Sequence, residues 1–96
     1  RALRRARDLC LDLGVKMCIE DTWGSDIATG AALHLAAATP KAGIMNVCDL
    51  SGYVSPRLDP DAPSREGGHI APSSAPGIGV NPDPEALGAP VLELSA

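Results

Sequence analysis

Two adjacent carboxylates, Glu20 and Asp21, follow a short apolar segment, and a hydroxyl side chain, an indole and a glycine come next. Packing inside a buried strand does not require two acidic residues at its end. In parallel sheets and barrels, ligands bind at the carboxyl ends of the strands. We therefore expect the residues that do chemistry to lie in the run from Met17 to Asp26.

The segments around these carboxylates predict a parallel β-α-β unit. Residues 15–19 are an apolar run of strand length, typical of a strand buried on both faces. Residues 27–39 are rich in alanine and predict a buried helix, which Pro40 ends. Residues 42–48 predict a second strand. A strand, a helix and a strand joined by short loops form a parallel pair with a right-handed crossover.

Capping and turn residues mark the ends of the helices. Apolar residues recur at helical spacing over residues 1–13, and Gly14 stands where a left-handed residue ends a helix. Gly24 is expected to allow a tight turn after the carboxylates. Ser25 or Asp26 is expected to cap the helix that follows.

The second half of the chain has a different composition. Residues 49–96 hold eight of the nine prolines, so long helices and central strands are not expected there. Gly67-Gly68 predicts a turn with a short edge strand at residues 69–71. Residues 83–88 predict a one-turn helix, and residues 91–94 a short strand. Such a segment has little core of its own, and we expect it to wrap over another domain.

Composition narrows the class of protein. The net charge is −4, and five of the eight basic residues lie in the first sixteen without interleaved aromatic residues, so no nucleic-acid partner is expected. No apolar run reaches about 18 residues, so no membrane partner is expected either. A chain of 96 residues encodes only one parallel strand pair, which needs neighbours on both sides. We therefore expect a piece of a longer protein.

The cysteines and histidines suggest no metal site. Cys10, Cys18 and Cys48 lack Cys-x-x-Cys spacing and are interpreted as small buried hydrophobic residues in a reducing compartment. His34 and His69 lie at no zinc-ligand spacing. His34 is interpreted as a structural residue of its helix. No metal ligand is expected in the chain, and the protein is expected to be cytoplasmic.

Several motifs carry a family resemblance. Residues 17–27, Met-Cys-Ile-Glu-Asp-Thr-Trp-Gly-Ser-Asp-Ile, and residues 33–40, Leu-His-Leu-Ala-Ala-Ala-Thr-Pro, resemble the seventh strand and helix of the mandelate racemase and muconate-lactonising enzyme family of the enolase superfamily. Residues 75–80, Ala-Pro-Gly-Ile-Gly-Val, resemble the Pro-Gly-Leu-Gly-Val turn near the C-terminus of these enzymes. The matches cover roughly residues 17–80.

The resemblance implies an α/β fold, the C-terminal part of a (β/α)8 TIM barrel. Residues 1–13 would be the sixth helix and residues 42–48 the eighth strand. Residues 1–54 would be the C-terminal portion of the barrel. Residues 55–96 would be an extension rich in proline and glycine that packs on the barrel or on the N-terminal capping domain.

The resemblance also implies an activity. The family abstracts a proton alpha to a carboxylate and stabilises the enediolate on Mg²⁺, as racemases, epimerases, dehydratases or cycloisomerases. Its lysine bases and acidic metal ligands lie on strands two to six, so no catalytic residue is assigned here, and the isolated chain is expected to be inactive. This chain would supply substrate-side residues. The longer protein is expected to bind a small carboxylate, including one with an ammonium group, and to form a homo-oligomer.

Four residues are candidates for substrate contact, and three of them resemble substrate-binding positions of the family. Glu20 resembles the glutamate that ends the seventh strand in muconate-lactonising and dipeptide-epimerising members. Asp21 resembles an aspartate of members that act on proline-derived betaines and hydroxyprolines, where a carboxylate would hold a substrate ammonium. Trp23 can add a cation–π attraction. Asp49 follows the eighth strand, but Leu50 stands where some hydroxyproline-type members have tryptophan.

A structural role is the alternative at each of these positions. Glu20 and Asp21 would form ion pairs with loops, Trp23 would pack between helices, and Asp49 would cap backbone amides in a turn. Two other classes of protein also remain open. One is a Rossmann-like nucleotide-binding protein, although no glycine-rich turn follows an upstream strand. The other is a non-catalytic interaction segment that binds through its proline-rich tail.

Overall fold

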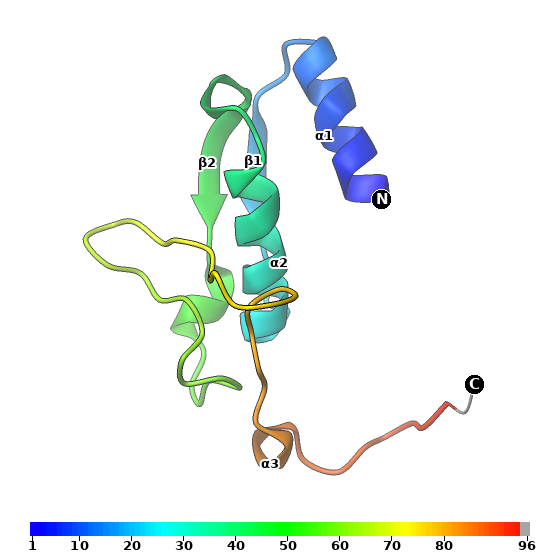
Figure 1. The fold of residues 1–96 in the computed structure, drawn as a ribbon, viewed down its shortest axis with the longest axis vertical. Helices are drawn as coiled ribbons and strands as arrows, with labels where there is room; N and C mark the ends of the chain where they lie inside the picture. The colour runs from blue at the N-terminus through cyan, green and yellow to red at the C-terminus, as the bar shows by residue number, and fades with distance from the viewer. Residues whose placement is uncertain (95–96) are drawn as a thin grey trace.

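The computed structural model describes residues 1–94 and contains the predicted β-α-β unit (Figure 1). The elements in chain order are α1 (Ala2–Asp12), β1 (Met17–Glu20), α2 (Ser25–Ala37), the 3-10 turn η1 (Lys41–Gly43), β2 (Ile44–Cys48), the 3-10 turn η2 (Leu50–Tyr53) and α3 (Pro84–Leu87). Gly14 has a positive φ of 69°, as predicted for the residue after a helix. The predicted helices and the two strands of the β-α-β unit are confirmed with small shifts of their ends.

The two strands form a parallel sheet that α2 covers on one face (Figure 1). Ile19 of β1 and Leu33 of α2 are buried. The neighbours of Ile19 along β1, Cys18 and Glu20, are exposed, because successive side chains of a strand point to opposite faces. The prediction of a strand buried on both faces is therefore wrong for residues 1–94. We call the uncovered side the open face of the sheet.

Helix α1 stands apart from α2 and leaves an apolar groove beside β1. The groove has a volume of about 510 Å³ and is lined by α1, β1 and α2. Leu3 of α1 is 69% exposed and Leu13 is 68% exposed, so the predicted apolar face of α1 is largely uncovered. A hydrogen bond from Arg7 to the carbonyl oxygen of Ala38 (3.0 Å) ties α1 to the end of α2.

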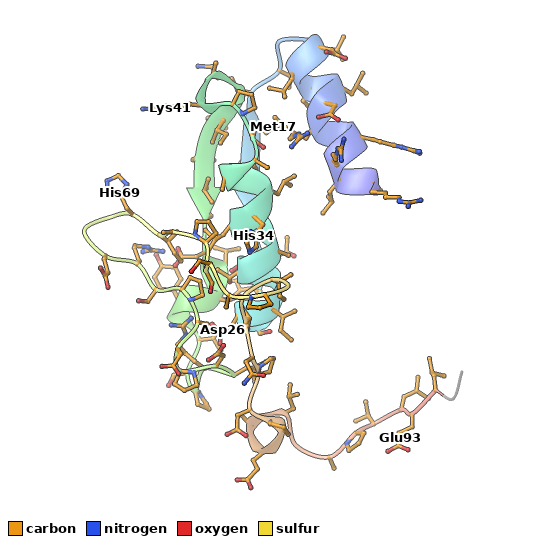
Figure 2. The ribbon with its side chains drawn as sticks, in the orientation of Figure 1. Met17, Asp26, His34, Lys41, His69 and Glu93 are labelled. Carbon is orange, nitrogen blue, oxygen red and sulfur yellow. The ribbon has the colours of Figure 1, made fainter. Side chains whose placement is uncertain are left out.

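The tail after β2 returns to pack on α2. Ile78 and Val80 lie against Gly30, where a side chain would collide with them. One turn further along α2, the His34 Nε2 atom lies 3.2 Å from the carbonyl oxygen of Ile78 (Figure 2). His34 is thus a structural residue of the helix, as predicted, and it holds the tail in place.

Most of the tail lacks regular structure. Gly67-Gly68 forms the predicted turn, but residues 69–71 form no strand beyond a single bridge between Glu66 and His69. Helix α3 is confirmed, and Asp83 caps it by accepting a hydrogen bond from the amide of Glu85 (2.9 Å). Residues 91–94 are exposed and form no strand, because no other strand lies beside them to pair with. None of the helices within residues 1–94 has the length and apolarity that a membrane crossing requires.

We expect Gly30→Ala to destabilise the protein, although alanine is favoured over glycine within helices by about 1 kcal/mol. The added methyl group would lie 2.8 Å from Val80 Cγ2 and 3.1 Å from the Ile78 carbonyl oxygen, so the tail must move off α2. Urea denaturation should show a lower free energy of unfolding, and limited proteolysis of residues 76–82 should be faster. Ala31→Gly, at an exposed position of the same helix, measures helix propensity alone. A gain in stability in Gly30→Ala would contradict the contact.

Candidate functional site

The strand ends place the adjacent carboxylates on opposite sides of the sheet. Glu20 is exposed on the open face, where it pairs across the ladder with Cys48. Asp21 is 3% exposed and Asp49, the residue after β2, is 8% exposed. Of the four residues predicted to contact substrate, Glu20 and Trp23 are therefore accessible in this arrangement, and the two aspartates are buried.

Asp21 accepts hydrogen bonds from three separate segments. Its Oδ1 accepts from the amides of Trp23 (3.3 Å) and Leu50 (3.1 Å). Its Oδ2 accepts from the Thr29 hydroxyl (2.5 Å) and the Ser51 amide (3.0 Å). The carboxylate thus joins the loop after β1 to α2 and to η2. This geometry favours the loop-anchor alternative for Asp21, and its contact with substrate stays a prediction.

The loop that Asp21 anchors has an unusual backbone. Thr22, Trp23 and Ser25 have positive φ angles of 51°, 65° and 64°, which L side chains rarely adopt. Each such residue costs about 1–3 kcal/mol, and such strain is concentrated at functional sites. The side chain of Trp23 is 60% exposed. It therefore stands free at the strand end and does not pack between helices.

One local prediction for this loop is wrong, because neither Ser25 nor Asp26 caps the helix. Helix α2 begins at Ser25, its N-cap is Gly24, and no side chain caps it. The predicted tight turn is present, closed by a hydrogen bond from the Gly24 amide to the Asp21 carbonyl oxygen (3.2 Å), and Gly24 itself has a φ of −82°. A Cβ atom at Gly24 would lie only 2.5 Å from that of Ala28, so glycine is needed for close approach to the helix.

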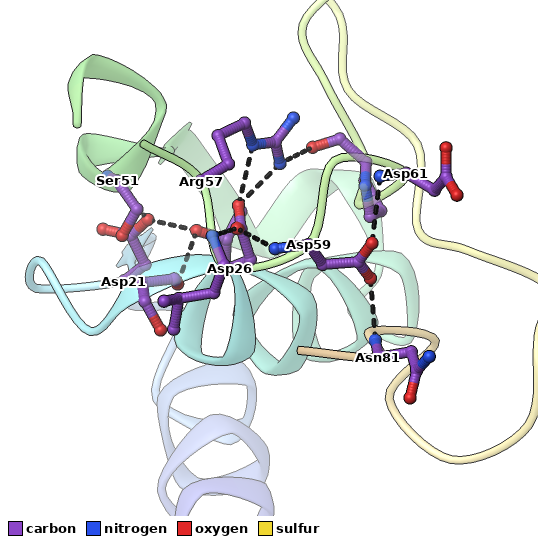
Figure 3. Close-up of polar contacts among 11 residues, drawn as sticks. Asp21, Asp26, Ser51, Arg57, Asp59, Asp61 and Asn81 are labelled. Atoms are coloured by element: carbon purple, nitrogen blue, oxygen red, sulfur yellow. Dashed lines mark hydrogen bonds and ion pairs between the residues drawn. The ribbon is translucent and has the colours of Figure 1, made fainter. Parts of the chain in front are cut away.

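Asp26 binds the tail instead of capping the helix (Figure 3). Its Oδ1 accepts hydrogen bonds from Arg57 Nε (3.0 Å) and Nη2 (2.6 Å), and its Oδ2 accepts from the amides of Leu58 (2.9 Å) and Asp59 (3.1 Å). Asp59 in turn accepts from the amide of Asn81 (2.7 Å). Sequence reasoning missed this network, because Asp26 and Arg57 are far apart in the chain.

Asp49 is paired with a cation from the tail. Its carboxylate forms an ion pair with Arg65, which also lies over the Tyr53 ring at 5.6 Å from the centroid. The hydrogen bond that Arg65 donates to Asp49, the contact with Tyr53 and the charge of Asp49 raise the pKa of Arg65. The charged group that solvent reaches beside Asp49 is therefore the guanidinium of Arg65. A contact of Asp49 with a substrate ammonium stays a prediction.

The open face carries two thiols beside Glu20. Cys18, Glu20 and Cys48 present ligand atoms that all lie within 4.8 Å of one another. The interpretation of the cysteines as buried is wrong for Cys18, which is exposed, while Cys10 and Cys48 are partly exposed. Partial desolvation of the sulfur atom, together with the nearby Glu20 and Cys48, raises the pKa of the Cys18 thiol. The signal in the sequence was the Cys-x-Glu spacing, which places both side chains on one face of a strand.

These residues do not fit Mg²⁺. Mg²⁺ takes oxygen ligands in octahedral geometry, whereas two of the three side chains in this cluster are thiols. Within residues 1–94, this is the one group of three or more histidine, cysteine or acidic side chains close enough to share an ion. Among residues 1–94, the one such cluster therefore lacks the all-oxygen ligands that Mg²⁺ prefers.

Comparisons with known proteins agree on a family. The family model described as "Enolase C-terminal domain-like" matches residues 1–86. The chain is 42% identical over 89 residues to a cis-3-hydroxy-L-proline dehydratase from Roseibium aggregatum, covering 93% of this chain and 24% of that protein. The chain thus spans about a quarter of the length of this curated relative.

Solved structures from Roseovarius nubinhibens ISM are similar in fold and sequence. A member of the enolase superfamily complexed with magnesium is 42% identical, with a TM-score of 0.85 over 93% of this chain and 24% of that one. A mandelate racemase/muconate lactonizing enzyme from the same organism is 39% identical, with a TM-score of 0.83 and the same coverage of both chains.

We expect Asp21→Asn to lower the free energy of unfolding by roughly 1–3 kcal/mol. An amide has one acceptor oxygen in place of two, so its NH₂ group would face amide and hydroxyl donors. Chemical denaturation of the full-length protein measures the change. Glu20→Gln is the matched control, because the neighbouring carboxylate is exposed and its loss should leave stability nearly unchanged. Equal effects of the two substitutions would contradict the anchor.

The stabilisation by Asp21 should also depend on pH. Burial alone would raise the pKa of Asp21, but hydrogen bonds from Thr29, Ser51 and Trp23 outweigh it and hold the pKa below its ordinary value of 3.8. A lowered pKa means that the contribution is complete above 3.8 and is lost as the pH falls through the pKa of the folded protein. The difference in unfolding free energy between wild type and Asp21→Asn should therefore be constant near neutrality and shrink below 3.8. If the difference in unfolding free energy instead grew as the pH fell, the pKa of Asp21 could not be lowered in the folded protein.

Proposed function

This chain belongs to the enolase C-terminal domain-like family, and we propose that it forms the end of the catalytic barrel of an enzyme that removes a proton alpha to a carboxylate. In this proposal α1, β1, α2 and β2 are the sixth helix, seventh strand, seventh helix and eighth strand of a (β/α)8 barrel. The substrate is a small carboxylate with an ammonium group, of the proline-derived type, and the reaction is a dehydration or an epimerisation. The similarity to a cis-3-hydroxy-L-proline dehydratase supports this choice.

The observation that carries the proposal is the exposure of Glu20 at the end of β1. Its carboxylate lies on the open face, and the ion pairs found within residues 1–94 involve other acids. The C-terminal ends of barrel strands are where active sites form. An acid that is free at such a position is available to a ligand, whereas Asp21 and Asp49 are already engaged.

In the proposed mechanism this chain recognises the substrate. The Glu20 carboxylate accepts hydrogen bonds from the substrate ammonium, and the exposed indole of Trp23 lies on the next turn of chain. Asp21 holds the strained loop in one conformation. Glu20 and Trp23 are therefore already positioned when the substrate binds. The base, the metal ligands and the Mg²⁺ ion belong to parts of the longer protein outside this chain.

Two alternatives differ in substrate or in class. A muconate-type cycloisomerase or dipeptide epimerase would use Glu20 at the same position on another carboxylate. A non-catalytic interaction segment would instead bind through the proline-rich tail. The fixing of that tail to α2 by Asp26, Gly30 and His34 argues against the second alternative, because the tail is held internally. Assembly as a homo-oligomer and a cytoplasmic location remain predictions.

We expect Glu20→Gln in the full-length enzyme to lower kcat/KM by about ten- to a hundredfold for an ammonium-bearing substrate. The change keeps the shape and removes the charge, and a lost charge-assisted hydrogen bond costs roughly 1.5–3 kcal/mol. Steady-state kinetics on cis-3-hydroxy-L-proline and on other proline-derived amino acids measures the change. Glu85→Gln, on the exposed helix α3, is the control for loss of a carboxylate. Unchanged efficiency in Glu20→Gln would exclude Glu20 from substrate binding.

A further inference from the structure

We propose that Cys18, Glu20 and Cys48 bind a thiophilic divalent cation of the Zn²⁺ class on the open face of the sheet. The three side chains come from two paired strands, and their ligand atoms all lie within 4.8 Å of one another. The site shares Glu20 with the proposed function, so a bound cation and a substrate ammonium would compete for its carboxylate. Metal titration without substrate tests the cation site, and steady-state kinetics tests the proposed function separately.

The strand register brings the three ligands together. Cys18 and Glu20 are two residues apart on β1 and therefore share a face. Glu20 is paired with Cys48 and Cys18 with Asn46, so the two cysteines lie diagonally across the ladder. The Asn46 side chain lies 3.7 Å from Cys48 Sγ as a donor. The backbone positions are fixed by the sheet, which is a rigid support for a metal site.

The distances are close to those that a tetrahedral ion requires. Zn–S bonds of about 2.3 Å and Zn–O bonds of about 2.0–2.2 Å place the ligand atoms about 3.5–3.8 Å apart. The observed separations, at most 4.8 Å, need only side-chain rotation to reach this range. Cys18 and Glu20 are exposed and therefore free to rotate.

Charge favours occupation of the site by a cation. Without an ion, the thiolates of Cys18 and Cys48 and the Glu20 carboxylate would repel one another, because their ligand atoms all lie within 4.8 Å. A divalent cation would convert this repulsion into attraction and displace the thiol protons. Two thiolates and one carboxylate select Zn²⁺ or Cd²⁺ over Mg²⁺ and Ca²⁺, because soft ligands suit thiophilic ions. Three protein ligands would leave one tetrahedral position open, as in catalytic zinc sites.

The test is a titration of the full-length protein with Co²⁺, the spectroscopic substitute for Zn²⁺. The protein is kept reduced with a phosphine, and excess Mg²⁺ occupies oxygen-ligand sites. We expect one equivalent of Co²⁺ to produce a thiolate charge-transfer band that Zn²⁺ abolishes by displacement. Cys18→Ser and Cys48→Ser should each lose the band. Cys10→Ser, at the cysteine on α1 outside the cluster, should retain it.

A second measurement uses the unaltered protein, so that misfolding of a variant cannot decide the result. Zn²⁺ should slow alkylation of Cys18 and Cys48 in peptide mapping by mass spectrometry and leave the alkylation rate of Cys10 unchanged. Glu20→Gln should weaken Co²⁺ binding by at least about 10- to 100-fold. Loss of a group that only hydrogen-bonds to a metal ligand already costs this much. The absence of the band, its retention in either cluster variant, or equal protection of all three cysteines would overturn the proposal.

Discussion

The structure depends on buried aspartates that accept hydrogen bonds from backbone amides. The segment after β2 has almost no regular secondary structure, so its amides lack the partners that helices and sheets supply. Asp21 accepts from η2, Asp26 from Leu58 and Asp59, and Asp59 from Asn81. Charge-assisted hydrogen bonds are stronger than neutral ones, so a few carboxylates can hold loops that no sheet would order. Figure 3 shows how these contacts converge beside the start of α2.

This network explains why two adjacent acids have different roles. Strand alternation turns Glu20 to the open face and leaves Asp21 at the junction of β1, α2 and η2. If the two orientations were exchanged, Asp21 would be exposed and Glu20 would be buried. The longer glutamate side chain would then meet amides whose spacing suits aspartate. In the proposed function, the ligand contact of Glu20 therefore depends on the adjacent Asp21, which holds the loop. The strained backbone at Thr22 and Trp23 is consistent with this view, because such conformations persist only where surrounding contacts hold them.

Local patterns in the sequence predicted the helices and strands. Contacts between residues far apart in the chain could not be predicted from it. The β-α-β unit, the end of α1 at Gly14 and the cap of α3 by Asp83 depend on residues close in the chain. The role of Asp26 depends on Arg57, which is brought to it only by the folded tail. Residues 91–94 have a strand-like composition, but a strand forms only beside a partner, and composition does not supply one.

The same reasoning separates candidate ligand groups from structural ones at the strand ends. A carboxylate whose acceptor positions are filled by its own chain gains little from a ligand, since each new contact must replace an existing one. This criterion favours a structural role for Asp21, Asp26 and Asp49, and contact of Asp21 and Asp49 with substrate stays a prediction. Glu20, Cys18 and Cys48 remain accessible to some degree and lie on one face. In the proposed function it is therefore the open face of the sheet, which carries Glu20 of the acidic run, where this chain contributes to chemistry.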